Sequence, residues 1–139
     1  MKTAWFFAAL LVLACSETGT KNGLQHLSGY WEIEKVVFPG GATKEYTISP
    51  AIDYFEIRPD SSGFRKKLEP QFNGRFLSTD DAESFRLKTV KNELKIRYKT
   101  ALDAWQETIL TIDENRLIIK NKDNLTYFYK RFIPIEINP

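Results

Sequence analysis

A regular alternation of apolar and polar residues in residues 85–99 constrains the fold of this chain more than any other feature. In residues 85–89, and again in residues 94–99, every second side chain is apolar and most of those between are basic. Because successive side chains of a β-strand point to opposite faces, the pattern predicts two strands that each have one apolar face. Lys91-Asn92 between them predicts a short hairpin turn.

Similar short segments recur along the chain, and no stretch has the apolar stripe and caps of a sustained helix. Residues rich in turn formers separate them, as in residues 59–63, 113–115 and 121–124. The further predicted strands are residues 30–38, 51–58, 63–68, 72–77, 104–112, 116–120 and 125–133. Residues 42–48, between two Pro- and Gly-containing turns, are predicted to form one long loop, acting as a lid or a short strand.

Eight or nine short antiparallel strands in one domain predict an all-β fold. A content of 42% apolar and 14% aromatic residues supplies enough apolar surface to order the chain. Strands joined in order either close into an up-and-down barrel or leave two edges exposed, and closure removes the edges. We therefore expect a small barrel, although a two-sheet sandwich would produce a similar alternation.

The first residues predict an export signal. Lys2 precedes an apolar run over residues 4–14, which is shorter than the roughly 17 to 25 residues that span a bilayer. The run ends at Ala14, directly before Cys15, the only cysteine of the chain, and residues 16–23 are polar. We expect residues 1–14 to be removed and residues 15–26 to form a flexible tether to a domain of residues 27–139.

This segment resembles the signal of bacterial lipoproteins. Val12, Ala14 and Cys15 match the pattern of that class, whereas Leu13 stands where alanine or serine is commoner. The resemblance implies that Cys15 becomes the lipidated first residue and anchors the protein firmly to a membrane. Ser16 is not the aspartate that retains enteric lipoproteins at the inner membrane, so the resemblance favours the outer membrane, on its periplasmic side or at the cell surface. The alternative is a soluble secreted protein in which Cys15 is a bystander.

Both ends of the predicted domain resemble the lipocalin-like domain of small bacterial lipoproteins. Gly29-Tyr30-Trp31 places a Gly-x-Trp before the first strand, and Lys130-Arg131 lies in the last strand. In that family the tryptophan closes the bottom of an eight-stranded barrel, and an arginine of the last strand lies across its ring. The resemblance thus implies a structural cation–π pair between Trp31 and Arg131, with Lys130 as the alternative cation.

Several side chains are expected to face the barrel interior and to line any ligand site. Trp105, Glu107 and Ile109 share one strand face, so Glu107 would be a carboxylate inside the barrel, either as a polar anchor for a ligand or paired with an inward basic residue such as Arg131. The predicted ligand-lining residues are Trp31, Phe55, Phe85, Tyr98, Trp105, Glu107, Tyr127 and Tyr129. So many large side chains compete for the space inside a small barrel that a large cavity is not expected.

Other functional classes find little support. A formal charge of +2 gives no field that would recruit nucleic acid, and Arg65-Lys66-Lys67 places neighbouring cations on opposite faces of a strand. The single histidine, His26, has no metal ligands at suitable spacing, and we expect no metal or cofactor. With no free thiol and one peripheral histidine, an enzyme is not expected.

The sequence therefore predicts a membrane-anchored barrel that binds or carries a small apolar or amphipathic molecule in the cell envelope. The alternative is a barrel with a filled interior whose loops contact another envelope protein, either as an interaction module or as an inhibitor. A cavity inside the barrel would favour the first hypothesis.

Overall fold

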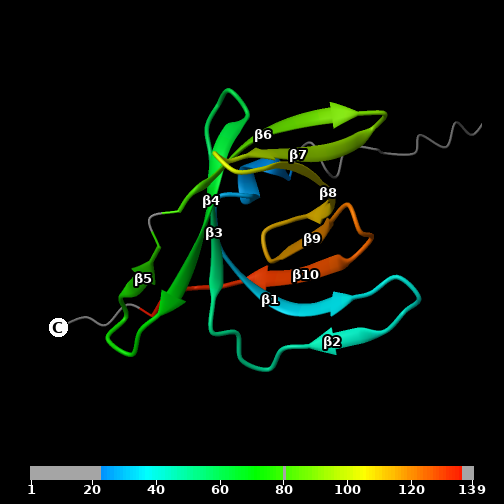
Figure 1. Cartoon of the computed structure of the whole chain (residues 1–139). Helices are drawn as coiled ribbons and strands as arrows, with labels where there is room; N and C mark the ends of the chain where they lie inside the picture. The colour runs from blue at the N-terminus through cyan, green and yellow to red at the C-terminus, as the bar shows by residue number, and fades with distance from the viewer. Residues whose placement is uncertain (1–22, 80, 136–139) are drawn as a thin grey trace, which may run out of the picture.

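The computed structural model describes residues 23–79 and 81–135, and in this part of the chain it contains ten β-strands, a short 3-10 helix and no α-helix (Figure 1). The elements are η1 (Leu24–His26), β1 (Gly29–Val37), β2 (Thr43–Glu45), β3 (Ile52–Ile57), β4 (Ser62–Pro70), β5 (Phe76–Ser78), β6 (Glu83–Val90), β7 (Glu93–Lys99), β8 (Ala104–Ile112), β9 (Arg116–Lys120) and β10 (Thr126–Arg131). The predicted export signal and Cys15 lie outside the described residues.

Eight of the strands form a closed antiparallel barrel. Their order is β10-β9-β8-β7-β6-β4-β3-β1, and β10 pairs with β1 to close the ring. The two short strands lie beside it, β2 on the edge of β1 and β5 on β4. The predicted all-β barrel is confirmed, and the alternative of a two-sheet sandwich is wrong because the first and last barrel strands are paired through six residue positions.

Most predicted strands coincide with observed ones, and the hairpin of β6 and β7 turns at Lys91 and Asn92, which both have positive φ. The segment of residues 42–48, for which a short strand was one alternative, contains strand β2, which pairs with residues 35–37 of β1. The strand predicted for residues 72–77 is shorter, since residues 71–75 form a tight turn in which the amide of Gln71 donates to the carbonyl of Arg75 at 2.8 Å.

The barrel has two unlike ends. We call the end that carries η1 and the turns at residues 58–61, 91–92 and 113–115 the closed end, and the end that carries the loops at residues 38–42, 46–51, 100–103 and 121–125 the open end. A continuous apolar core fills much of the barrel interior, and it includes Trp31 at the closed end as well as Tyr98 and Tyr129. Its fully or nearly fully buried members include Leu27, Trp31, Phe55, Phe85, Ile96, Leu117 and Ile119.

Trp31 is completely buried at the closed end. Its indole Nε1 donates a hydrogen bond to the carbonyl of Leu27 at 2.9 Å, so the polar atom of the ring is satisfied. The guanidinium carbon of Arg131 lies 3.8 Å from the centre of the Trp31 ring, and the two residues are direct partners in the β1–β10 register. The last strand thus covers the tryptophan of the first strand.

Arg131 also gathers the chain segments of the closed end by hydrogen bonds to their carbonyls. Its Nε donates to Glu114 at 2.9 Å and its Nη1 to Ser28 at 3.0 Å, while Nη2 donates to His26. Gly29 leaves room for this side chain: it has a φ of +121°, and a Cβ there would lie 2.7 Å from Nη1. A side chain at position 29 would therefore strain the backbone and displace the guanidinium.

Residues 24–26, which we expected to belong to the tether, are part of the fold. They form η1, and Leu24 packs against the core. All strands and core residues of the described chain lie between Leu24 and Arg131, so a chain that starts at Ser16 keeps every contact of the barrel.

We predict that Arg131→Ala lowers the free energy of unfolding by about 2 kcal/mol, because it removes both the cation–π contact and three hydrogen bonds to carbonyls. Urea denaturation checks the value. Arg131→Lys should recover only part of the loss, since an ammonium group cannot satisfy the three carbonyls in the same fork geometry. Equal stability of wild type and Arg131→Ala would contradict a closing role for this residue.

Candidate functional site

Charged side chains occupy the interior of the barrel towards its open end. Arg65 on β4, Glu83 on β6 and Glu107 on β8 all point inward, because Arg65 is the register partner of buried Phe55 and of Glu83, and Glu107 is the partner of buried Ile96. The side chains of Arg65 and Glu107 are only 13% and 12% exposed. Buried charges are costly unless they are paired, so these groups must satisfy one another.

Arg65 is the centre of this cluster. Its Nε donates to a carboxylate oxygen of Glu83 at 2.6 Å, and its Nη1 lies 3.6 Å from a carboxylate oxygen of Glu107. Its guanidinium carbon lies 4.6 Å from the centre of the Tyr98 ring. Burial lowers the pKa of Arg65, but Tyr98 and the two glutamates outweigh it and raise the pKa, so the group stays cationic.

The partner of Glu107 is therefore Arg65, and the pairing with Arg131 that we considered is wrong. Arg131 lies at the closed end over Trp31, whereas Glu107 lies in the open half. The run Arg65-Lys66-Lys67 could have predicted this inward cation, because strand alternation turns Arg65 and Lys67 inward and Lys66 outward. Glu83 begins strand β6, and its carboxylate pairs with Arg65.

A second polar contact joins β3 and β10, two strands that are separated by β1. Asp53 on β3 is 5% exposed, and one of its oxygens accepts a hydrogen bond from the Tyr129 hydroxyl at 2.9 Å. Its other oxygen lies 3.1 Å from the Lys67 ammonium. Sequence analysis missed Asp53, because an aspartate between apolar residues gives no local sign of a partner 76 positions away.

Tyr98 and Trp105 form an aromatic wall beside Arg65. Their rings are stacked, with centroids 4.9 Å apart and planes 14° from parallel. Tyr98 is 2% exposed, and its hydroxyl has no hydrogen-bond partner among the described residues. Burial raises the pKa of Tyr98 well above its usual value, so the group is a neutral donor that lacks an acceptor. A buried hydroxyl without a partner calls for a ligand or a water molecule.

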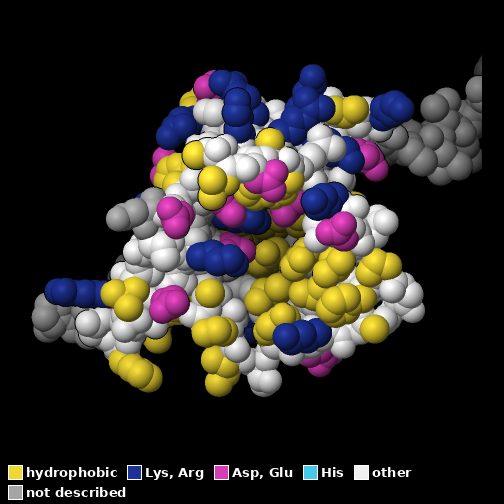
Figure 2. All heavy atoms as spheres, viewed as in Figure 1, with side chains coloured by type: hydrophobic (Ala, Val, Ile, Leu, Met, Phe, Trp, Pro, Cys, Tyr) yellow, Lys and Arg dark blue, Asp and Glu magenta, His cyan; other side chains and the backbone are white. Residues whose placement is uncertain are grey.

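The predicted ligand-lining residues differ in burial. Trp31, Phe55, Phe85, Tyr98 and Tyr129 belong to one buried core cluster and are at most 7% exposed. Trp105, Glu107 and Tyr127 are only partly buried, and Trp105 and Tyr127 pack against that core. Figure 2 shows a hollow in which acidic and basic side chains lie beneath a rim rich in hydrophobic side chains. The arrangement offers an aromatic wall next to fixed charges.

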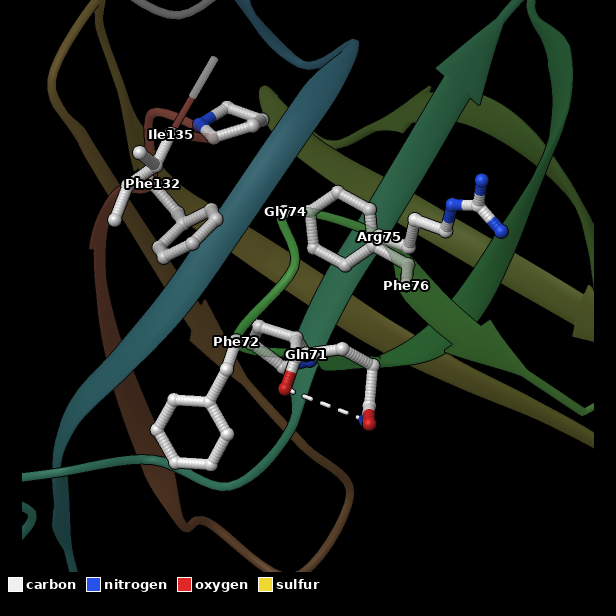
Figure 3. Close-up of a pocket in the computed structure, with 9 residues that line it drawn as sticks. Gln71, Phe72, Gly74, Arg75, Phe76, Phe132 and Ile135 are labelled. Atoms are coloured by element: carbon white, nitrogen blue, oxygen red, sulfur yellow. Dashed lines mark hydrogen bonds between the residues drawn. The ribbon is translucent and has the colours of Figure 1, made fainter. Parts of the chain in front are cut away.

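A second, smaller hollow lies outside the barrel. It has a volume of about 280 Å³ and lies between the β4–β5 turn and the segment that follows β10. Figure 3 shows Phe76, Phe132 and Ile135 around it, with Phe72 turned away at its edge. Its lining is mostly apolar and it contains no buried charged group, so it has fewer means to orient a ligand than the barrel interior.

Two further classes of feature are missing from the described part of the chain. Residues 23–79 and 81–135 contain no group of three histidine, cysteine or acidic side chains placed to hold a metal ion. Within the same residues, no helix is long and apolar enough to cross a membrane.

We predict that Glu107→Gln makes the protein relatively more stable at about pH 8 than at about pH 4. Burial raises the pKa of Glu107 above 4.5, and Arg65 only partly opposes this. A carboxyl group with a raised pKa in the folded state contributes stability below its unfolded pKa, and that contribution is lost as the pH rises through the folded pKa. Chemical denaturation of both proteins at the two pH values measures the difference.

Glu93→Gln is a matched control of opposite sign. A hydrogen bond from Lys95 lowers the pKa of Glu93, so its contribution is present at higher pH and is lost as the pH falls. The control should therefore be relatively less stable at about pH 8 than at about pH 4. Identical pH dependence of wild type and Glu107→Gln would contradict burial of an ionisable carboxyl group inside the barrel.

A comparison with solved structures found two similar chains: a lipocalin-like protein from Bacteroides uniformis, with 9% identity and a TM-score of 0.49, and an uncharacterized protein from Bacteroides eggerthii, with 10% identity and a TM-score of 0.48. The matches cover 77% and 76% of this chain and 99% of each of those chains. No curated protein matches the sequence.

The sequence model of the lipocalin-like domain matches residues 27–119, which is more than half of the chain. The matched part begins at Leu27, whose carbonyl accepts the hydrogen bond of the Trp31 indole, and it ends at Ile119 in β9. This chain, which forms a closed antiparallel barrel with Trp31 at its base, therefore belongs to the lipocalin-like domain family.

Proposed function

We propose that this protein binds a small amphipathic molecule in the open half of its barrel and does so as a lipid-anchored protein of the cell envelope. The observation that carries the binding proposal is the Tyr98 hydroxyl, which is buried beside Arg65 without an acceptor among the described residues. A ligand oxygen at this point would satisfy it, while the Trp105 ring would pack against an apolar part of the same molecule.

The charges of the barrel interior determine which kind of polar head group a ligand can have. Asp53, Glu83 and Glu107 supply three carboxyl groups against the buried cation Arg65, and Lys67, whose side chain is 68% exposed, adds a second cation at the edge of the interior. Arg65 already lies against two of the carboxylates, so it has little capacity left for an anion. A neutral or cationic head group with an acceptor oxygen for Tyr98 fits this cluster better than a carboxylate does.

The binding proposal is tested with two compounds that share one tail, 1-octanoylglycerol and octanoate. A chain that starts at Ser16 retains two of the three tryptophans, and Trp31 is buried at the closed end. We expect saturable binding of octanoylglycerol that changes the emission of Trp105, and at least about tenfold weaker binding of octanoate because of repulsion by the carboxylates. Trp105→Phe should abolish the emission change and retain binding measured by calorimetry.

Two variants locate the bound molecule. Trp105→Ala removes the aromatic wall of the interior and should weaken octanoylglycerol binding, whereas Phe72→Ala changes an exposed ring at the edge of the outer hollow and should not. The proposal is wrong if neither compound binds, or if only Phe72→Ala impairs binding. Tighter binding of octanoate would contradict the inferred preference for an uncharged head.

The envelope location is supported by the signal-like run before Cys15. We predict that Cys15→Ser moves the protein from the membrane fraction to the soluble fraction of the cells that produce it, because the acylated side chain is lost. Mass spectrometry of the wild-type N-terminal peptide should find an acylated cysteine at position 15. An unmodified wild-type peptide would contradict the lipid anchor and would favour the alternative, a soluble secreted protein.

A non-enzymatic interaction or inhibitor module remains the second candidate. Leu102 and Ile48 in loops of the open end are 98% and 85% exposed, and such side chains at a loop tip can insert into a partner protein. A filled interior that binds neither octanoyl compound, together with capture of a specific envelope protein through these loops, would favour this reading.

A further inference from the structure

The outer face of the β6–β7 hairpin is strongly basic. We call its exposed cations the basic face: Arg58, Arg86, Lys88, Arg97 and Lys99. Arg86, Lys88, Arg97 and Lys99 point away from the barrel because they alternate with the buried residues of β6 and β7, and Arg58 lies in the neighbouring β3–β4 turn. Figure 2 shows basic side chains gathered along the part of the surface where β6 and β7 lie in Figure 1. The chain as a whole has a net charge of only +2, so this face is much more basic than the average surface.

Like charges lie directly opposite one another on these two strands. Arg86 is the register partner of Arg97, and Lys88 is the partner of Lys95. Opposed like charges destabilise a sheet. The charge of Lys95 is compensated, because its ammonium group lies 2.6 Å from a carboxylate oxygen of Glu93. In contrast, no carboxylate of the described residues lies within 4 Å of the guanidinium groups of Arg86 and Arg97. Asp60 lies near enough to attract Arg86 and Arg58, and Nε of Arg97 donates to the side-chain oxygen of Gln106 at 2.9 Å, so the repulsion is offset in part and an external anion would reduce it further.

A shallow groove runs along the same face. It has a volume of about 590 Å³, and its lining includes four of the five cations together with Ser62 and Ser84. Guanidinium groups and hydroxyls are donors that suit the oxygens of phosphate groups. The groove is open along its length, so it fits an extended anionic surface better than a single enclosed anion.

The basic face reaches the closed end of the barrel, where the described chain begins. The amide of Leu87 on β6 donates to the carbonyl of Ser61 at 2.8 Å, and the amide of Ile57 donates to the hydroxyl of Ser28 at 3.0 Å, so the β3–β4 turn lies between β6 and the start of β1. Only eight residue steps separate Cys15 from Gly23, which corresponds to at most ~29 Å of extended chain. A lipid on Cys15 would hold this end of the barrel next to the membrane.

We propose that the basic face rests on the phosphate headgroups of an anionic membrane, so that the side of the barrel formed by β6 and β7 lies against the lipid. Charge complementarity drives the contact, and the groove beside Arg86 and Arg97 receives the headgroups. The proposal concerns a surface separate from the interior ligand site and does not depend on it.

The test uses the chain that starts at Ser16, so that no acyl chain contributes. We expect it to sediment with vesicles in which about a third of the phosphatidylcholine is replaced by phosphatidylglycerol, and not with pure phosphatidylcholine vesicles. Binding should disappear at ~1 M salt, where charges are screened within about 3 Å. Arg86→Gln with Arg97→Gln should lower the partition coefficient about 30-fold, since each cation near an anionic surface contributes about fivefold.

Lys44→Gln with Arg75→Gln is the matched control, because it removes the same charge from exposed positions outside the basic face. The control should reduce binding much less. The Arg86 and Arg97 variant should melt no lower than wild type, since it removes a repulsion, and this separates lost binding from lost folding.

Three results would overturn the proposal. Equal weakening by both double variants would mean that only net charge matters. Displacement from vesicles by ~10 mM inorganic phosphate, at constant ionic strength, would indicate a small-anion site in place of a membrane surface. Tight binding to heparin or RNA without binding to anionic vesicles would assign the face to a different polyanion.

Discussion

The contact between Arg131 and Trp31 is the interaction on which the rest of the structure depends. It joins the last strand to the first, and the same guanidinium ties three carbonyls of the closed end together. A sheet that is closed in this way has no long exposed edge, and one end of its interior is sealed by an indole and the apolar core around it. The stability of the barrel is therefore concentrated at one end.

Sealing one end leaves the other free to hold polar groups. The apolar core occupies much of the interior, and Arg65 and Glu107 lie beside it with side chains that are only 13% and 12% exposed. These charges are tolerated because each has a partner: Arg65 contacts two glutamates, and Asp53 contacts Tyr129 and Lys67. The hydroxyl of Tyr98 is the polar atom of this region that remains unmatched among the described residues, and it directs attention to the interior as a binding site.

The proposed interior site and the proposed membrane contact are compatible because they use different parts of the barrel. Inward residues of β4, β6 and β8 form the polar interior, whereas outward residues of β6 and β7 form the basic face. In the proposed arrangement the outer face of β6 and β7 lies against the lipid, and the inner faces of the strands remain available to a ligand.

The sequence by itself determined the strands, the β6–β7 hairpin and the inward direction of Trp105, Glu107 and Tyr129, because period-two alternation is a local property of the chain. Only the tertiary structure decided which inward groups meet. Arg65 and Glu107 lie on strands separated by β6 and β7, and Asp53 and Tyr129 on strands separated by β1, so their contacts arise from closure and register across the barrel interior. Alternation reports the face on which a side chain lies, but it carries no information about the strand that lies opposite.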